Sequence, residues 1–323
     1  MRNALVTGGG GFIGSNLVRT LVERGYAVKV LDDWSTGSPA NLAGLEGSVQ
    51  VIEADVRDSS AVSKATAGTE VLYHLAALPS VARSIADPHA SHSVNASGTL
   101  TILTAARDSG VQRVVYASSS SIYGDTPTLP KHEEMPVNPR SPYAAAKLSG
   151  EAYSRAFTQA FGLETVSLRF FNVFGPRQDP ASEYAAVIPR FITRMASARP
   201  PKIYGVGTQS RDFTFVSNAV DACVRAGEAD SRSAGEVINV GCGSRVTLLE
   251  IVGALNSLMG TRLEPELGPP REGDVMHSQA DISRAITLLG YQPSVTVTEG
   301  LSRTVEWFTH SPPTGVAIGK GAA

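Results

Sequence analysis

The sequence predicts an α/β fold in which a doubly wound parallel sheet is followed by a smaller substrate-binding α/β domain. Short runs rich in β-branched residues alternate with amphipathic segments over residues 1–171, and such alternation is typical of βαβ units. Each amphipathic segment is followed by a glycine, the residue that helix C-termini favour. From Asn172 onward, clusters of proline separate shorter elements, which indicates a change of architecture.

Six buried strands and four helices are expected in the first part of the chain. The strands are the runs 4–7, 27–31, 49–53, 71–75, 114–117 and 165–170. The helices are 12–24, 59–67, 88–109 and 142–161, and they end at Gly25, Gly68, Gly110 and Gly162. We therefore expect a dinucleotide-binding domain over 1–171. A mainly substrate-binding domain follows over 172–310, some of whose segments return to the first domain, and 311–323 is expected to be a disordered tail.

Composition excludes several classes of protein. The chain has 323 residues, of which 42% are hydrophobic and 18% charged, so it can bury a sizeable core. Its formal net charge of −2, without a long Lys/Arg run, argues against a nucleic-acid partner. No stretch approaches the ~18 apolar residues of a membrane span, and we expect a cytoplasmic protein without a membrane partner. Cys223 and Cys242 lack metal-ligand spacing, so no metal is expected.

The first expected strand leads into a glycine-rich turn. Gly8, Gly11 and Gly14 recur every three residues between a strand and a helix. With this arrangement a backbone approaches a pyrophosphate at a helix N-terminus. Asp32 closes the second strand, where a carboxylate binds ribose hydroxyls and repels a 2′-phosphate. The sequence therefore predicts NAD rather than NADP as the cofactor.

Further cofactor contacts are expected where the strands of the sheet end. The complete expected set, apart from catalytic residues that also touch the cofactor, is Gly8, Gly11, Phe12, Ile13, Asp32, Asp33, Asp55, Val56, Leu75, Ala76 and Ala77. Trp34 follows directly, near the expected adenosine, and we interpret it as a cover over the cofactor.

A tyrosine, a lysine and a run of serines carry the expected chemistry. Tyr143 and Lys147 lie four residues apart in an expected helix, so their side chains share one face. A free phenol has a pKa of about 10 and becomes a base near neutral pH only if nearby positive charge stabilises its phenolate. The serines of 118–121 end the fifth strand and project hydroxyls toward the same cleft. This pattern predicts Tyr143 as a base that Lys147 tunes.

The ordered set of these motifs resembles the extended short-chain dehydrogenases/reductases of the NAD-dependent epimerase/dehydratase type, which have a Rossmann fold. It consists of TGGGGFIG (7–14), a serine before YG (123–124), YAAAK (143–147) and RFFNVFG (169–175). Three stretches, FNVFGPRQDP (171–180), YAAVIP (184–189) and REGDVMHS (271–278), are most similar to bacterial UDP-N-acetylglucosamine 4-epimerases. The resemblance covers about residues 1 to 310.

Site roles follow from this resemblance, residue by residue. It implies Tyr143 as catalytic base, Lys147 as its tuner and as a ligand of the nicotinamide ribose, and Ser119 as partner of the sugar 4-oxygen. Ser118 and Ser120 remain alternatives for the last role. The expected substrate-binding residues are Ser80, Ser119, Asn172, Gln178, Ala186, Arg211, Arg271 and Ser278. Among them, Arg211 and Arg271 are expected to bind the diphosphate, because guanidinium groups match phosphate oxygens bidentately.

The expected function is C4 epimerisation of a UDP-sugar through a transient 4-keto intermediate. The expected substrates are UDP-GlcNAc and UDP-GalNAc, with UDP-Glc and UDP-Gal as a further pair. Tyr143 removes the 4-hydroxyl proton while a hydride passes to tightly bound NAD, and the hydride then returns to the opposite face. An NDP-sugar dehydratase is one alternative. Ser120–Ser121 occupies the place where related dehydratases carry Asp-Glu, although Glu133 and Glu134 keep this alternative open. An epimerase of another sugar, such as a UDP-uronic acid, is a second, and a non-catalytic NAD-binding protein a third.

Three further features carry expectations. The family associates a bulky tyrosine at the last position of the 271–278 stretch with exclusion of N-acetylated sugars, and this chain has Ser278 there. Ser217–Asn218 stands where many relatives carry an aspartate, and the sequence assigns no consequence to this difference. The helices that start at Pro88 and Pro142 have alanine-rich faces, which fit a homodimer, as in the family, or packing within the chain.

Overall fold

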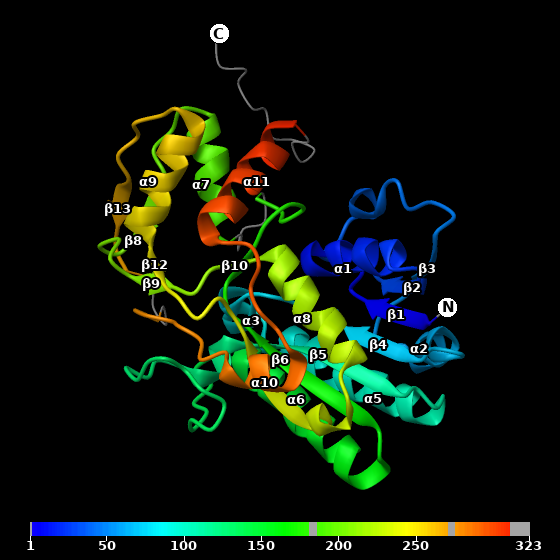
Figure 1. Ribbon diagram of the computed structural model, residues 1–323. Helices are drawn as coiled ribbons and strands as arrows, with labels where there is room; N and C mark the ends of the chain where they lie inside the picture. The colour runs from blue at the N-terminus through cyan, green and yellow to red at the C-terminus, as the bar shows by residue number, and fades with distance from the viewer. Residues whose placement is uncertain (1, 181–185, 271–274, 311–323) are drawn as a thin grey trace.

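The central layer is one parallel sheet. The computed structural model describes residues 2–180, 186–270 and 275–310. Seven strands pair in the order β11-β6-β5-β4-β1-β2-β3, and every pairing is parallel (Figure 1). They are β1 (Asn3–Thr7), β2 (Ala27–Asp32), β3 (Val49–Glu53), β4 (Val71–His74), β5 (Arg113–Ser119), β6 (Glu164–Phe170) and β11 (Glu236–Val240). The expected doubly wound sheet is thus confirmed, and its seventh strand comes from the second half of the chain.

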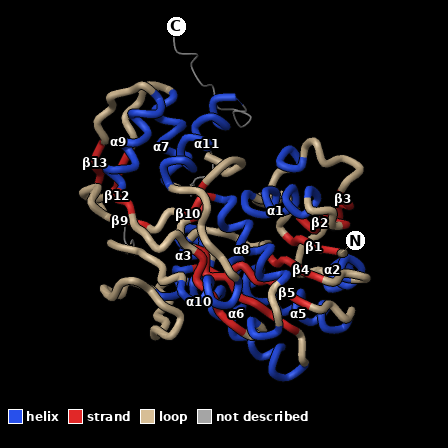
Figure 2. The backbone as a smooth tube through the Cα atoms, in the orientation of Figure 1, coloured by secondary structure: helices blue, strands red, loops and turns tan. Residues whose placement is uncertain are grey.

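Helices cover both faces of this sheet (Figure 2). On one face α1 (Phe12–Glu23) packs beside α8 (Val216–Glu228). On the other, α2 (Ser59–Thr66), α5 (Thr99–Asp108) and α6 (Pro142–Phe161) lie side by side. Each face has its own cluster of buried aliphatic side chains, as expected for strands that are apolar on both sides.

The expected helix over 88–109 is interrupted. It consists of α4 (Pro88–His92), a π-helical stretch over Ser93–Gly98, and α5. Asn95 in the π-helical stretch donates to the Leu78 carbonyl (3.0 Å) and accepts from the Leu78 amide (2.8 Å). Such π-bulges often mark functional sites. Here the bulge turns an amide toward the segment that follows β4, a tertiary contact that helical periodicity does not reveal.

The second half of the chain builds a smaller lobe and also returns to the sheet. At the upper left of Figure 1, α7 (Val187–Ala196), α9 (Leu248–Met259) and α11 (Val297–His310) pack together. Short two-stranded sheets join β7 (Val173–Phe174) with β10 (Thr214–Phe215), β8 (Lys202–Tyr204) with β13 (Glu266–Gly268), and β9 (Ser210–Arg211) with β12 (Val246–Thr247). The remaining helices are α3 (Val81–Ala86), α10 (Ser283–Leu289) and short 3-10 turns over Pro39–Leu42, Ser120–Tyr123 and Ser231–Ser233.

A buried amide explains Asn218 in the unusual Ser217–Asn218 pair, whereas nothing in the described part of the structure explains Ser217. Asn218 donates through Nδ2 to the Val295 carbonyl (2.8 Å) and accepts through Oδ1 from the Val295 amide (3.1 Å). An aspartate could accept there but could not donate. The asparagine therefore ties α8 to the segment that enters α11, and the structure supplies the consequence that the sequence did not reveal.

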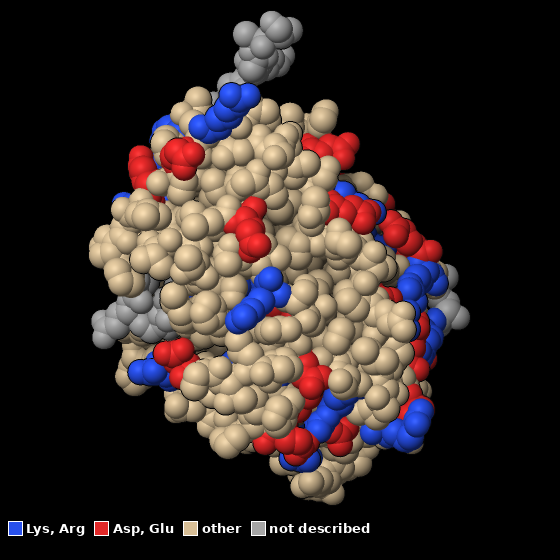
Figure 3. Space-filling view, turned by 60° about the vertical axis from the view of Figure 1, so that its left-hand side comes forward, with Lys and Arg blue, Asp and Glu red and all other residues tan. Residues whose placement is uncertain are grey.

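The surface and the helices are consistent with the composition. On the face drawn in Figure 3, Lys and Arg side chains lie interspersed with Asp and Glu rather than gathered into one stretch. Within 2–180, 186–270 and 275–310, no helix is long and apolar enough to cross a membrane.

Gly150 permits the close packing of α6 on β5. A Cβ at this position would lie 2.2 Å from the hydroxyl of the buried Tyr116. We expect Gly150→Ala to lower the free energy of unfolding by about 1–3 kcal/mol, because overpacking forces the helix away from the strand. Gly253→Ala is the matched control: Gly253 also lies within a helix, nothing surrounds its Cβ position within 4 Å, and alanine should stabilise that helix by about 0.5–1 kcal/mol. Thermal unfolding of both variants tests this, and equal effects would contradict it.

Candidate active site

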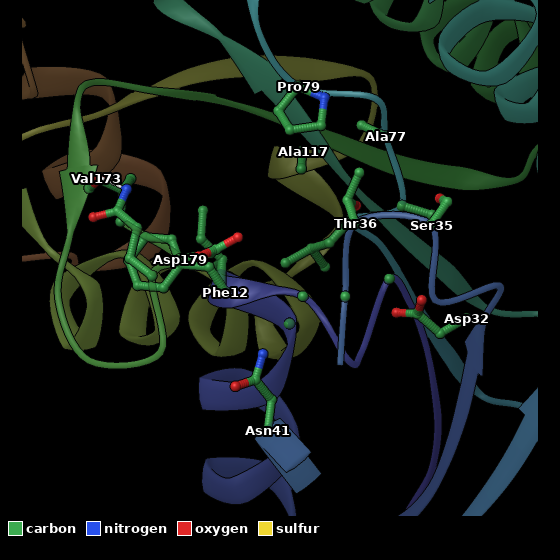
Figure 4. A pocket seen from close by; sticks show the side chains of 18 of the residues that line it. Phe12, Asp32, Ser35, Thr36, Asn41, Ala77, Pro79, Ala117, Val173 and Asp179 are labelled. Atoms are coloured by element: carbon green, nitrogen blue, oxygen red, sulfur yellow. Dashed lines mark hydrogen bonds between the residues drawn. The ribbon is translucent and has the colours of Figure 1, made fainter. Parts of the chain in front are cut away.

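A cavity of about 1100 Å³ lies at the carboxyl ends of the sheet strands, with walls from both halves of the chain. In Figure 4, Asp32 and Ser35 lie at one end, Val173 and Asp179 at the other, and Phe12 between them. Most sequence-predicted site residues line this cavity. They are Gly8, Gly11, Phe12, Ile13, Asp32, Asp33, Val56, Leu75, Ala76, Ala77, Ser80, Ser119, Tyr143, Lys147, Asn172, Gln178 and Ala186.

The glycine turn forms a tight cradle at one wall. Gly8 has a φ of +70°, and a Cβ there would lie 2.6 Å from the Ala76 amide nitrogen. A Cβ on Gly14 would lie 2.0 Å from the Gly8 carbonyl oxygen. No side chain fits at either position, so only glycine lets the turn pack this closely against α1 and the segment after β4, and Gly8, Gly11 and Gly14 line the cavity. This geometry fits the pyrophosphate of a dinucleotide at the helix N-terminus.

Asp32 closes the turn from β2. Its carboxylate accepts hydrogen bonds from the Gly10 amide (2.8 Å) and the Trp34 amide (2.9 Å). Burial raises the pKa of Asp32, and these two bonds oppose that shift. Trp34 does not line the cavity: its ring packs where a Cβ on Gly10 would be. The tryptophan therefore supports the glycine turn instead of covering the cofactor space.

The segments after β3 and β4 are held by different contacts. Val56 lines the cavity, whereas Asp55 points its carboxylate to Arg57 in an ion pair and is not part of the wall. After β4, the Ala76 amide donates to the Thr7 hydroxyl (3.3 Å), which also bonds to His74 Nδ1 (2.7 Å). Burial lowers the pKa of His74 to about 3, so this histidine is a neutral structural link at physiological pH.

Tyr143, Lys147 and Ser119 line the same cavity. The first two come from α6 and the serine from the end of β5. Lys147 Nζ donates to the Ala117 carbonyl (2.8 Å) and lies 6.0 Å from the centre of the Tyr143 ring. Burial raises the pKa of Tyr143, and a hydrogen bond from Ser119 lowers it. Burial also lowers the pKa of Lys147 to about 8, so its ammonium is still largely charged at neutral pH.

The serine run separates into distinct environments. Ser118 and Ser119 both line the cavity, and the Ser119 hydroxyl, which lowers the pKa of Tyr143, accepts from the Ser121 amide (3.2 Å). Ser118 donates its hydroxyl to the buried carboxylate of Glu151, and Ser120 starts a 3-10 turn outside the cavity wall. Of the three serines considered, Ser119 therefore has the geometry expected for a partner of the sugar oxygen.

The opposite wall is a loop that the sequence analysis covered only in part. Asn172, Gln178 and Ala186 line the cavity as expected. Arg177, which we did not select although it lies in the FNVFGPRQDP motif, adopts a φ of +70° and donates to Asn16 Oδ1 (2.7 Å). Asn16 on α1 donates in turn to the Pro176 carbonyl (3.1 Å). These bonds fasten the loop over the first turn of α1.

Arg211 and Ser278 do not line the cavity. They lie together around Ser210, in a neighbouring segment of the second lobe. Arg211 Nη1 donates to the Ser210 carbonyl (3.0 Å) and the Met276 carbonyl (3.1 Å). The Ser278 amide donates to Ser210 (3.0 Å), and the serine is only 9% exposed. Arg271 falls outside the described residues. No group of His, Cys, Asp and Glu that could hold a metal ion occurs in the part of the chain that the structure describes.

Asp212 supports this segment and was missed by the sequence analysis. Its buried carboxylate accepts from the amides of Cys242 (2.7 Å), Gly243 (3.0 Å) and Ala280 (3.1 Å), and burial raises its pKa to about 6. Its place beside Arg211 in a recurring motif was the sequence signal that could have identified it.

Several residues that line the cavity were not selected from the sequence. They include Arg19, Ser35, Thr36, Asn41, Pro79, Arg83 and Asp179. Several follow Asp32 in one loop, which brings them to the cofactor end of the cavity.

Comparison with known proteins identifies the family. Residues 4–241 match the model of the NAD dependent epimerase/dehydratase family. A UDP-glucose 4-epimerase of Mycolicibacterium smegmatis is 43% identical over 308 residues, which cover 94% of this chain and 97% of that protein.

Two solved structures have the same fold. A UDP-N-acetylglucosamine 4-epimerase from Methanobrevibacter ruminantium, in complex with UDP-N-acetylmuramic acid, superposes with a TM-score of 0.91 at 37% identity and covers 95% of this chain and 98% of its own. A UDP-glucuronic acid 4-epimerase from Bacillus cereus, in complex with UDP-glucuronic acid and NAD, gives 0.89 at 33% identity, with coverages of 95% and 99%. The Rossmann fold, NAD as cofactor and the resemblance drawn from the sequence are confirmed. The chain belongs to the NAD dependent epimerase/dehydratase family.

Proposed function

We propose that this enzyme interconverts UDP-N-acetylglucosamine and UDP-N-acetylgalactosamine by epimerisation at C4, and also accepts UDP-glucose and UDP-galactose. The observation that carries this proposal is the convergence of Ser119, Tyr143 and Lys147 in the cavity that begins at the glycine turn. The 4-epimerases among the similar proteins support the reaction class.

The catalytic roles of Tyr143, Ser119 and Lys147 follow from the charge that each side chain can carry or stabilise. When bound, NAD would supply the nicotinamide ring that takes up a hydride from C4 of the sugar and gives it back. Tyr143 as phenolate takes the proton of the 4-hydroxyl group, while Ser119 binds the same oxygen. The Lys147 ammonium stabilises the phenolate, because an adjacent positive charge favours the ionised form of a phenol. Gly8, Gly11, Phe12 and Asp32 would hold the cofactor, together with the other expected cofactor-binding residues.

Recognition of the nucleotide sugar rests on the second lobe. We assign Arg211 and Arg271 to the diphosphate, because guanidinium groups bind phosphate oxygens in pairs. Asn172, Gln178, Ala186 and Ser80 are assigned to the sugar, together with Ser278. Ser278 lies beside Ser210 next to the cavity rather than in its lining, and its assignment rests on the resemblance, in which a small residue at that position leaves room for a C2 acetamido group. The similarity to a UDP-N-acetylglucosamine 4-epimerase supports this choice.

The dehydratase alternative needs an acid and a base near C5 and C6. Glu133 accepts a hydrogen bond from the Asn239 amide (2.8 Å), and Glu134 forms an ion pair with Arg284. Neither glutamate lines the cavity that the described residues form. Because both glutamates are bound to other groups and lie outside the cavity wall, the dehydratase reaction is disfavoured. The uronic-acid alternative has a relative of matching specificity and stays the second candidate.

We also propose a homodimer. A hollow of about 440 Å³ lies between α4 and α6, lined by Pro88, His89, His92, Pro142, Ala145, Ala146 and Ser149. The small side chains of Ala145, Ala146 and Ser149 on α6 leave room for a second copy to pack there across a twofold axis. A cytoplasmic location and the absence of a nucleic-acid partner stay predictions.

Asp32 should determine the choice of cofactor. Asp32→Ala is expected to weaken NAD binding by about 1.5–3 kcal/mol and to reduce discrimination against NADP, because a charged hydrogen-bond acceptor and the charge that repels a 2′-phosphate are both lost. Titration calorimetry with NAD and with NADP measures this. Asp58→Ala, at the start of α2 and outside the cavity wall, should leave both affinities unchanged. Unaltered NAD affinity in the Asp32 variant would remove Asp32 from the site.

Tyr143 should be required for turnover and dispensable for binding. Tyr143→Phe removes only the phenol oxygen, so we expect it to retain NAD and UDP-sugars while losing most of kcat. The control is Tyr153→Phe in the same helix, since Tyr153 is 40% exposed and should keep full activity. Steady-state epimerisation with both substrate pairs provides the measurement, and an active Tyr143→Phe enzyme would reject the mechanism.

Ser278 should decide whether N-acetylated sugars fit. Ser278→Tyr is expected to suppress turnover of UDP-GlcNAc and UDP-GalNAc while sparing UDP-glucose and UDP-galactose, because the larger ring fills the space for the acetamido group. Ser257→Tyr, on the exposed side of α9, should leave the ratio of the two activities unchanged. If both substrate pairs respond alike, or if the native enzyme ignores N-acetylated sugars, the assignment of substrate fails and the 4-epimerase reaction is unaffected.

A further inference from the structure

Three side chains of α6 share one face that points toward the active site. Tyr143, Lys147 and Glu151 follow one another at intervals of four residues, which stacks them one turn apart. The first two line the cavity, whereas Glu151 lies behind them and does not. Its side chain is only 4% exposed. A carboxylate so deeply buried needs compensating partners.

A cross-strand pair beneath the helix supplies these partners. Ser118 on β5 and Arg169 on β6 are direct neighbours in the parallel register. Arg169, 5% exposed, donates through Nε (2.9 Å) and Nη2 (2.8 Å) to the two oxygens of Glu151. Ser118 donates its hydroxyl to the same carboxylate. Glu151 thus joins α6 to the two strands whose ends border the cavity, next to Ser119.

The charge of Glu151 also acts on Lys147. The titratable groups that face this lysine are Tyr143 and Glu151 from α6, Tyr116 from β5 and His74 from β4. Burial keeps His74 neutral, and it raises the pKa of Tyr116 so that this phenol is also uncharged. The Glu151 carboxylate is the group that opposes the effect of burial on the lysine.

We propose that Glu151 is a positioning residue of the catalytic centre: held by Ser118 and Arg169, it keeps the Lys147 ammonium charged and in place beside Tyr143. This inference rests on the proposed roles of Tyr143 and Lys147. Glu151 itself does not line the cavity, so it acts through the lysine.

The pH profile of kcat tests the proposal. Burial lowers the pKa of Lys147 to about 8, and the Glu151 charge raises it, so Glu151→Gln should lower it further. The ammonium is then lost at lower pH, and the alkaline limb of kcat should move to lower pH by about one unit. KM should change little, because Glu151 does not line the cavity. A kcat that falls equally at every pH, with the limb unmoved, would show a purely structural role and overturn the proposal.

A second variant separates charge from folding. Glu151→Gln leaves Arg169 buried without its counter-charge, which is costly. The double variant Glu151→Gln/Arg169→Met removes both charges and should recover stability in thermal unfolding. Its alkaline limb should still lie below that of the native enzyme. A double variant with the native limb would contradict the proposal even if the single variant does not fold.

A matched control lies at the other end of the same two strands. Glu164 pairs with Arg113, also between β6 and β5, but at the edge away from the cavity. Glu164→Gln should lower stability and leave the pH profile unchanged. If the alkaline limb of kcat moved equally in this control, the effect would come from loosening of the sheet, and the inference would be overturned. Failure of the proposed function gives a different result, since Tyr143→Phe would then retain turnover.

Discussion

The parallel direction of all seven strands is the constraint on which the rest of this structure depends. In a parallel sheet every carboxyl end lies at the same edge, so residues that are far apart in sequence become neighbours there. The glycine turn after β1, Asp32 at the end of β2 and Ser119 at the end of β5 all reach one cavity for this reason. The same constraint requires helical crossovers, which bring α6 alongside β5 and β6.

Buried polar groups fix the alignment that the sheet makes possible. The Glu151–Arg169 ion pair contributes little to stability, because desolvation offsets most of the attraction between buried charges, and the His74–Thr7 bond joins two neutral groups. Their effect is geometric: a helix that slid along the sheet would break three hydrogen bonds to Glu151 at once. Apolar contacts such as that of Gly150 with Tyr116 permit close approach, and the polar contacts select one register.

The two sides of the cavity are built from different kinds of structure. The sheet side is built from backbone and strand ends, so its shape follows from the fold and suits the cofactor. The other side consists of loops, whose shape depends on individual contacts such as Asn16 with Pro176 and Asp212 with the 242–243 amides. Similar proteins act on glucose, N-acetylglucosamine and glucuronic acid derivatives of UDP within one fold. Loop contacts, which small substitutions change, are the natural origin of that diversity.

The sequence by itself determined the elements and much of the site, because the signals are local. Six strands, the glycine turn and the Tyr143–Lys147 spacing depend on residues within a few positions of one another, where periodicity and backbone sterics suffice. Distant pairings were decided only by the tertiary structure. The addition of β11 to the sheet edge, the π-helical break that directs Asn95 to Leu78, and the orientation of Ser118 toward Glu151 and of Ser119 toward Tyr143 all belong to this group. Adjacent serines carry the same local signal and both line the cavity, but the alternation of side chains along β5 directs the Ser118 hydroxyl to Glu151 and leaves that of Ser119 beside Tyr143.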